Sequence, residues 1–254
     1  MKIKQAFSFE FSDVKKGMCI FYSVLGLLLI FFLVLFTING TPDSDSSFNS
    51  FEFSTYLFMF LMGCVMFNQS FHMTIQNGVS RRTMYFAKLL SFAAAAAIAT
   101  VINVALIIGG AFLPDHLTSF RMVTLLDVSY GLRMDFLSPA GSIFLTFMTF
   151  FLLMLLAAIG NFFAASYYKM TKSTAIVVSI CVPVILFAAI SLDVLFLNSR
   201  ILTKLLEAFN FISGLGLLPG TAFAPWRAPV SCLILSGIFF GITWLIIRRM
   251  DIKK

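Results

Sequence analysis

The run MCIFYSVLGLLLIFFLVLFTI at 18–38 holds about 21 residues and no charged side chain. A helix of that length extends about 30 Å, which matches the hydrocarbon thickness of a bilayer. Because backbone polar groups in lipid must bond within the chain, such a run is expected to be helical. No small-residue cleavage site follows it, so we expect a retained first helix and not a signal peptide.

The rest of the chain repeats this pattern. Of its 254 residues, 60% are hydrophobic and 11% are charged, and the mean hydropathy is +0.98. Soluble domains carry about 25% charged residues, so this chain is too poor in charge to cover itself with a hydrated surface. We expect one all-α membrane domain over 1–254, with six transmembrane helices. The spans are expected at about 18–38, 55–75, 89–113, 141–165, 174–194 and 229–247.

Several of the expected helix ends carry capping or breaking residues. Ser54 and Thr55 are suited to cap the second helix, and Ser138 followed by Pro139 fits the cap and first turn of the fourth. Pro183 falls inside the fifth span, where a kink is expected.

The distribution of basic residues orients these spans. With both termini inside, the inner segments hold 13 of the 18 basic residues and the outer segments hold 5. The inner set is Lys2, Lys4, Lys15, Lys16, Arg81, Arg82, Lys88, Lys169, Lys172, Arg248, Arg249, Lys253 and Lys254. Cytoplasmic loops of membrane proteins are rich in Lys and Arg, so we expect cytoplasmic N- and C-termini. The basic residues form no aromatic-interleaved stripe, so the net charge of +7 does not indicate a nucleic-acid partner.

Two segments outside the spans are expected to lie along the membrane. Residues 1–17 place Phe7, Phe11 and Val14 on one helical face between lysines, which favours an amphipathic helix on the inner leaflet. Residues 195–228 combine an apolar helical face with later Gly and Pro residues. We expect an outer re-entrant hairpin there, with a loosely ordered loop as the alternative. The segment 114–140 contains SFRMVTLLDVSYGLRMDFL, which suits a second interfacial helix.

The chain shows no set of residues that would support catalysis. It has only two histidines, His72 and His116, and no HExxH, GxSxG or paired intramembrane aspartates. The four cysteines form no CxxC pair, so neither a metal nor a disulfide framework is expected. No phosphate-binding loop is present either, so an ATP-driven activity would need another polypeptide. We therefore expect neither an enzyme nor a cofactor on this chain.

A few polar residues fall within the apolar spans. We expect a polar seam that involves the second and third helices, and it either holds helices together by hydrogen bonds or lines a substrate path. Its candidates are Asn68, Gln69, His72, Asn103 and Asn161. Gly237 and Gly241 form a GxxxG in the last span, which suits either packing within the chain or dimerisation.

The segment QNGVSRRTMYFAKLL at 76–90 is a compact basic turn between the second and third spans. Asn77-Gly78 is a strong turn signal, and Ser80 is suited to cap a short helix that begins at Arg81. Together with the six spans, the N-terminal helix and the outer hairpin, this segment resembles type-2 ABC export permeases. It is most similar to the short Gram-positive permeases that export peptides, such as lantibiotic self-immunity and phenol-soluble-modulin exporters. The loop at 114–140 is longer than in the smallest members.

The resemblance implies a permease subunit of the bacterial cytoplasmic membrane that exports an amphipathic substrate, such as a peptide. ATP and Mg would be bound by separate cytoplasmic ABC ATPase subunits, and two permeases would pair. The loop at 76–88 would be the coupling helix, the loop at 166–173 a minor contact, and the hairpin would match the outer gate helices. The residues facing the ATPase would be Gln76, Asn77, Gly78, Val79, Ser80, Arg81, Arg82 and Thr83. A non-transporting membrane scaffold or sensor is the alternative.

Overall fold

The computed structural model describes residues 3–39, 48–49, 51–111, 122–123, 125–131, 135–196, 199–216 and 222–250. Its helices are α1 (Ile3–Asn39), α2 (Phe51–Gln76), α3 (Arg81–Ala111), α4 (Leu125–Tyr130), α5 (Pro139–Lys169), α6 (Lys172–Phe196), α7 (Arg200–Ser213) and α8 (Arg227–Arg248). Strands β1 (Phe48–Asn49) and β2 (Met122–Val123) pair in parallel. The all-helical prediction is correct apart from this two-residue ladder.

Five of the described helices are long and apolar enough to cross a bilayer. These candidate spans are Ile3–Phe32, Arg81–Gly109, Pro139–Lys169, Ser173–Asp193 and Arg227–Arg248. In α2 the described apolar stretch is Glu52–Phe67, which is shorter than a span, although the helix itself continues to Gln76. The chain is therefore a membrane-embedded helical protein with several spanning helices.

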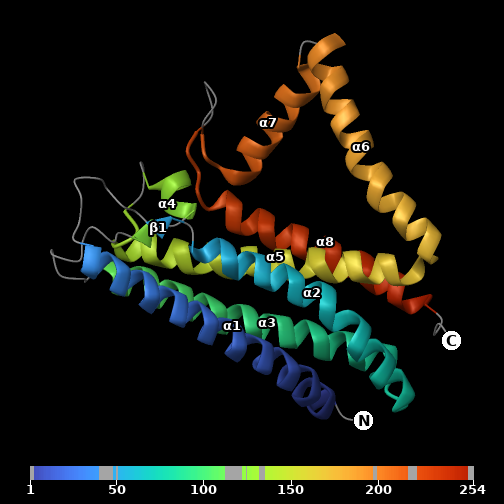
Figure 1. Cartoon of the computed structure of the whole chain (residues 1–254). Helices are drawn as coiled ribbons and strands as arrows, with labels where there is room; N and C mark the ends of the chain where they lie inside the picture. Colours follow the sequence, from blue (N-terminus) through green and yellow to red (C-terminus); the bar gives the residue numbers. More distant parts are fainter. Residues whose placement is uncertain are drawn as a thin grey trace.

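Helix α5 lies at the centre of the bundle. It packs mainly against α2 and α8 and also against α3, while α1 packs along α3. The largest buried cluster lies between these helices and includes Phe67, Phe71, Phe92, Leu153 and Ile247. The start of α1, the turn between α2 and α3, the turn between α5 and α6, and the end of α8 all lie at one end of the bundle (Figure 1). We call this the basic end, because most of the described lysines and arginines lie near it.

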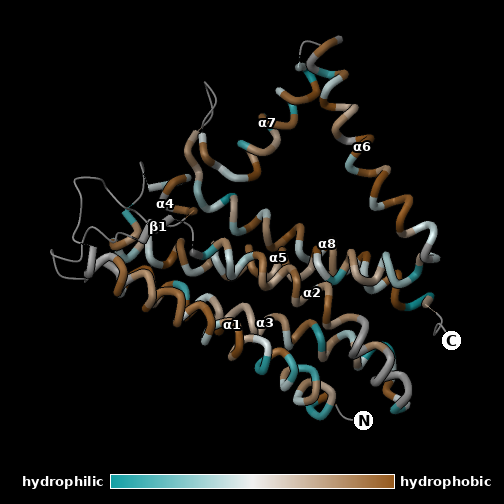
Figure 2. Tube along the Cα trace, in the orientation of Figure 1, coloured by the Kyte–Doolittle hydropathy of each residue, from teal (hydrophilic) through white to brown (hydrophobic). Residues whose placement is uncertain are grey.

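Helices α6 and α7 form a V in which α6 stands away from the central bundle, while α7 returns to it and packs against α8 (Figure 1). The apolar window of α6 has none of its residues buried, and Figure 2 shows that helix hydrophobic along most of its length. The V is closed at its tip by Asp193, whose carboxylate accepts the backbone N–H groups of Ile201 and Leu202 at 3.0 and 2.8 Å. Asp193 therefore caps the start of α7.

The first helix differs from its prediction. Residues 3–39 form one continuous helix, so no break separates the expected surface helix at 1–17 from the span at 18–38. The physical reason is packing along its length: Val14 and Met18 are buried in the main cluster, and Gly17 lies against Met62. A surface helix followed by a span would need a bend, and the helix carries no proline or internal cap to make one.

The other helix boundaries were predicted with mixed success. Ser138 caps α5 by accepting the N–H of Gly141 at 3.1 Å, and Pro139 opens that helix, as predicted. Pro183 lies inside α6, also as predicted. The expected caps of α2 are wrong, because that helix begins at Phe51 and buries Thr55 one turn inside. Within 114–140 the described helix ahead of α5 is the short α4, and residues 114–121, 124 and 132–134 lie outside the described residues.

Candidate functional site

The turn between α2 and α3 is shorter than predicted. Helix α2 ends at Gln76 and α3 begins at Arg81, so only residues 77–80 lie between them. Gly78 has φ +70°, the left-handed conformation that glycine adopts most readily. Ser80 caps α3 by accepting the N–H of Thr83 at 3.2 Å. The expected short helix at Arg81 is thus the first part of α3 itself, because nothing interrupts the helix before Lys88.

The predicted ATPase-facing residues are not equally available at the surface. Asn77, Gly78, Ser80 and Arg82 are exposed, Val79 is buried, and the side chain of Gln76 lies outside the description. Arg81 and Thr83 are half-buried. The Arg81 guanidinium donates a hydrogen bond to the carbonyl oxygen of Arg248 at 2.8 Å, which satisfies one of the free carbonyls at the end of α8.

A second hydrogen bond fixes the start of α3 to α8. The Tyr85 hydroxyl donates to the carbonyl oxygen of Phe240 at 2.5 Å, and its ring lies 5.2 Å from that of Trp244. Tyr85 and Arg81 are four residues apart and therefore lie on the same face of α3. Because both side chains contact α8, the start of α3 is joined to α8 as well as, through the turn, to α2.

We predict that Tyr85→Phe weakens this link without disrupting the fold. The ring contacts remain, and the lost hydrogen bond should lower the free energy of unfolding by about 0.5–1.5 kcal/mol. Thermal unfolding of the detergent-solubilised protein measures the effect. Tyr167→Phe is the matched control, because that hydroxyl is bonded to Ser179 on the exposed surface. Equal losses in the two variants would contradict a special role for the Tyr85 bond.

Lys88 is the clearest departure from the sequence-based prediction at this end. It was expected in the cytoplasmic loop, but it lies in α3 with a side chain only 2% exposed. Its ammonium donates to the carbonyl oxygen of Met66 at 3.2 Å and lies 5.0 Å from the centre of the Phe67 ring. The carboxylate of Glu10, which is also 2% exposed, acts electrostatically on this ammonium. Lys88 therefore joins α3 to α2, lies within electrostatic range of Glu10 on α1, and is not a free surface charge.

The expected polar seam is divided between two helix contacts. Asn103 of α3 is fully buried and accepts a hydrogen bond from Thr55 of α2 at 3.3 Å. Asn161 belongs instead to the contact between α2 and α5, where its backbone N lies beside Gly63. Thr55 and Gly63 are eight residues apart, or about 12 Å along α2, so the two asparagines do not form one group. The side chains of Asn68, Gln69 and His72 lie outside the described part of α2.

Two of these buried amides are incompletely hydrogen-bonded. Among the described residues, the Nδ2 atom of Asn103 and both polar atoms of the Asn161 side chain have no hydrogen-bond partner. Both residues are 0% exposed. A buried amide without hydrogen bonds lowers the stability of the fold. An enclosed water bonded to the Asn161 side chain would therefore stabilise it.

Buried polar residues in the first turns of α2 were not predicted from the sequence. Glu52 is 0% exposed, and its Oε2 atom accepts a hydrogen bond from the Tyr56 hydroxyl at 3.3 Å. Glu52 precedes the expected span at about 55–75, but an acidic residue in the first turn is itself a signal for a helix start. That signal would have moved the start of α2 to its observed position.

No group of three or more His, Cys, Asp or Glu side chains that could hold a metal ion occurs within the described ranges. The functional candidates are therefore the exposed turn at the basic end and the buried polar residues behind it. Comparison of the chain with protein families, curated proteins and solved structures gives no match.

Proposed function

We propose that the chain is the membrane-spanning permease subunit of an ATP-driven exporter, with the turn at 77–80 as its contact with a separate cytoplasmic ATPase. The observation that supports this most strongly is the construction of the turn. Its residues are exposed at the basic end, while the helix that it starts is bonded to α8 through Arg81 and Tyr85. A push on the turn would therefore move α2, α3 and α8 together, as coupling to a partner requires.

The topology of this permease would use α1, α2, α3, α5, α6 and α8 as six spans. The basic end would face the cytoplasm of a bacterium, in accord with the positive-inside rule. The segment 195–228, which contains α7, would act as the outer hairpin, and the unburied apolar surface of α6 would face lipid and a second permease. ATP and Mg would bind to the partner ATPase, and the substrate would be an amphipathic molecule such as a peptide.

Charge reversal at the turn tests this function. Arg82→Glu should reduce co-purification of the ATPase encoded by a neighbouring gene by about tenfold or more, because Arg82 is exposed and free to meet a partner. Arg249→Glu, which makes the same charge change at the exposed end of α8, is the control and should retain the ATPase. Substrate-stimulated ATPase activity of the purified complex is the second measurement.

Arg81 is a poor probe of this contact, because replacing it would also remove the bond to Arg248. The proposal is wrong if the Arg82→Glu complex forms and hydrolyses ATP as the unaltered one does. It is also wrong if Arg82→Glu and Arg249→Glu lose the ATPase equally, since a diffuse positive surface would then explain the binding.

A further inference from the structure

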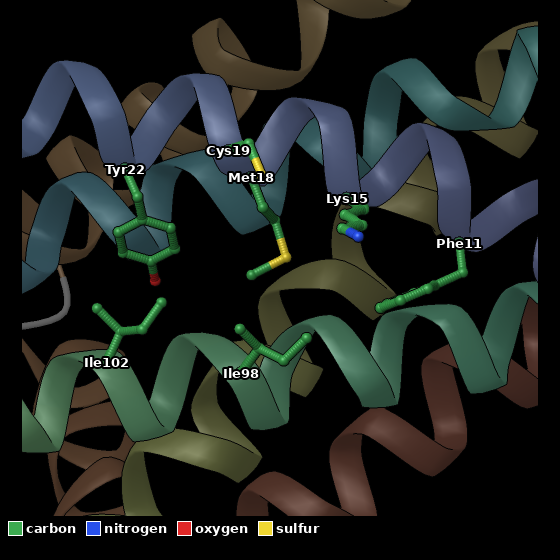
Figure 3. A pocket seen from close by; sticks show the side chains of 7 residues that line it. All are labelled: Phe11, Lys15, Met18, Cys19, Tyr22, Ile98 and Ile102. Carbon is green, nitrogen blue, oxygen red and sulfur yellow. The ribbon is translucent and has the colours of Figure 1, made fainter.

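A groove of about 300 Å³ lies between α1 and α3 on the side of the bundle. Phe11, Lys15, Met18, Cys19 and Tyr22 line it from α1, and Ile98 and Ile102 line it from α3 (Figure 3). Nothing in the described bundle fills this space, although α1 and α3 pack against each other elsewhere along their length.

The chemistry of the lining is almost entirely apolar. Lys15, Cys19 and Tyr22 are the lining residues that carry polar groups, but the Tyr22 hydroxyl is itself buried, and the groove wall is formed almost wholly by hydrocarbon, aromatic and sulfur atoms. An apolar space of this kind holds water poorly and favours an apolar chain. The groove is therefore suited to the hydrocarbon part of a ligand.

Lys15 is the single basic residue among those that line the groove. Its side chain is exposed and lies on the side of α1 that faces α3 (Figure 3). A lysine of this kind buries its methylene stem along apolar surface and leaves its ammonium available to an anion. The neighbouring Lys16 is equally exposed but does not line the groove.

The order of these residues along the bundle sets the direction of a bound amphiphile. Phe11 and Lys15 lie nearer the start of α1, which is at the basic end, and Tyr22 and Ile102 lie farther from it (Figure 1, Figure 3). An anionic headgroup at Lys15 would thus point toward the basic end, with its hydrocarbon chain running toward the middle of the bundle. That is the orientation of a phospholipid in the leaflet next to the basic end.

We infer that this groove is a binding site for an anionic phospholipid, with one acyl chain between α1 and α3 and its phosphate group paired with Lys15. The inference does not depend on the proposed export function. A bound chain would bridge α1 to the helix that starts at the turn, so lipid composition would affect how tightly α1 is held.

Cys19 offers a local readout of occupancy. It is exposed and lines the groove, whereas Cys181 is exposed on α6, away from it. The full chain in detergent would be titrated with dioleoylphosphatidylglycerol or dioleoylphosphatidylcholine and treated with N-ethylmaleimide. Mass spectrometry of the digested protein would then give the alkylation rate at each cysteine. We expect phosphatidylglycerol to slow alkylation of Cys19 at about fivefold lower concentration than phosphatidylcholine, with no such preference at Cys181.

Lys15→Gln should abolish this preference, and Lys16→Gln is the matched control that should keep it. Ile98→Trp provides a second test that leaves the charge unchanged, because an indole in the groove should displace the acyl chain and reduce the number of phosphatidylglycerol molecules retained in native mass spectrometry. Thermal unfolding confirms that each variant is folded. The assignment would be overturned if the two lipids protected Cys19 equally, or if Cys181 showed the same preference for phosphatidylglycerol. It would also be overturned if Lys15→Gln and Lys16→Gln lost that preference to the same extent.

Discussion

Replacing Gly160 with leucine is expected to abolish the folded bundle. Gly160 of α5 and Gly63 of α2 face each other where these two helices cross. A Cβ atom at Gly63 would lie 2.5 Å from the carbonyl oxygen of Ala157, and one at Gly160 would overlap the carbonyl oxygen of Phe60. Backbone atoms limit both positions, so a side chain could enter only if the helices separated.

The loss should be large because α5 is the central helix. Overpacking a well-packed contact costs about 1–3 kcal/mol, and here rotamer changes offer no relief because backbone atoms stand on both sides. Cys64 adds to the contact by donating from its thiol to the carbonyl oxygen of Gly160 at 3.4 Å. We therefore expect Gly160→Leu to yield little monodisperse protein in size-exclusion chromatography, and Gly63→Leu to behave in the same way.

The last helix provides the control. A Cβ atom at Gly237 or Gly241 meets no described atom within 4 Å. Leucine at either position should therefore leave the elution profile and the unfolding temperature of the detergent-solubilised chain nearly unchanged. If Gly237→Leu proved as damaging as Gly160→Leu, the close crossing of α2 and α5 would not be the reason for the loss.

These glycines also show what the sequence could and could not predict. The GxxxG of Gly237 and Gly241 is the visible motif, but packing within the described chain does not use it. The close crossing uses Gly63 and Gly160, which stand 97 positions apart in the sequence and form no local pattern. Helix existence was predictable because lipid imposes it on every apolar run. Which helices touch depends on surfaces that meet only in three dimensions.

The turn at 77–80 was predictable for a local reason, since Asn-Gly and a following Ser specify a turn and a cap by themselves. The environment of Lys88 was not, because a lysine near a predicted helix end is ordinarily a hydrated charge. Its burial depends on Glu10, which precedes it by 78 positions and acts on it from another helix. Glu52 was missed for the same reason: its burial depends on neighbouring helices, so composition alone placed it before the expected span.

The separation of α6 from the central bundle is another feature that no local sequence pattern predicts. Its hydropathy is as high as that of the buried helices, so it was indistinguishable from a bundle member. In a membrane, lipid solvates apolar side chains as well as protein does, so hydropathy identifies a span but not its neighbours. The polar cap at Asp193 ties the far end of α6 to α7, and the hydrogen bond between Tyr167 and Ser179 ties its first half to α5.

The second large loss of stability is expected when Lys88 is replaced. Replacing Lys88 with methionine should lower the free energy of unfolding by about 3 kcal/mol or more, because it leaves the buried Glu10 carboxylate without the nearby positive charge. Lys88→Glu should lower the free energy of unfolding further, because it places a second carboxylate in the same buried region. Lys4→Met, at an exposed position of α1 near the same end, is the control and should change stability by less than about 0.5 kcal/mol.

A double-mutant cycle separates the charge interaction from packing. Glu10→Gln and Lys88→Met should each destabilise the protein, and the double variant should lose less than the sum of the two, because removing both charges leaves neither buried alone. Unfolding in detergent, followed by circular dichroism, supplies the four free energies. Strict additivity would mean that Lys88 is held by the Met66 carbonyl and the Phe67 ring alone. A Lys88→Met protein as stable as Lys4→Met would mean that the buried ammonium does not help to hold α1 and α2 to α3.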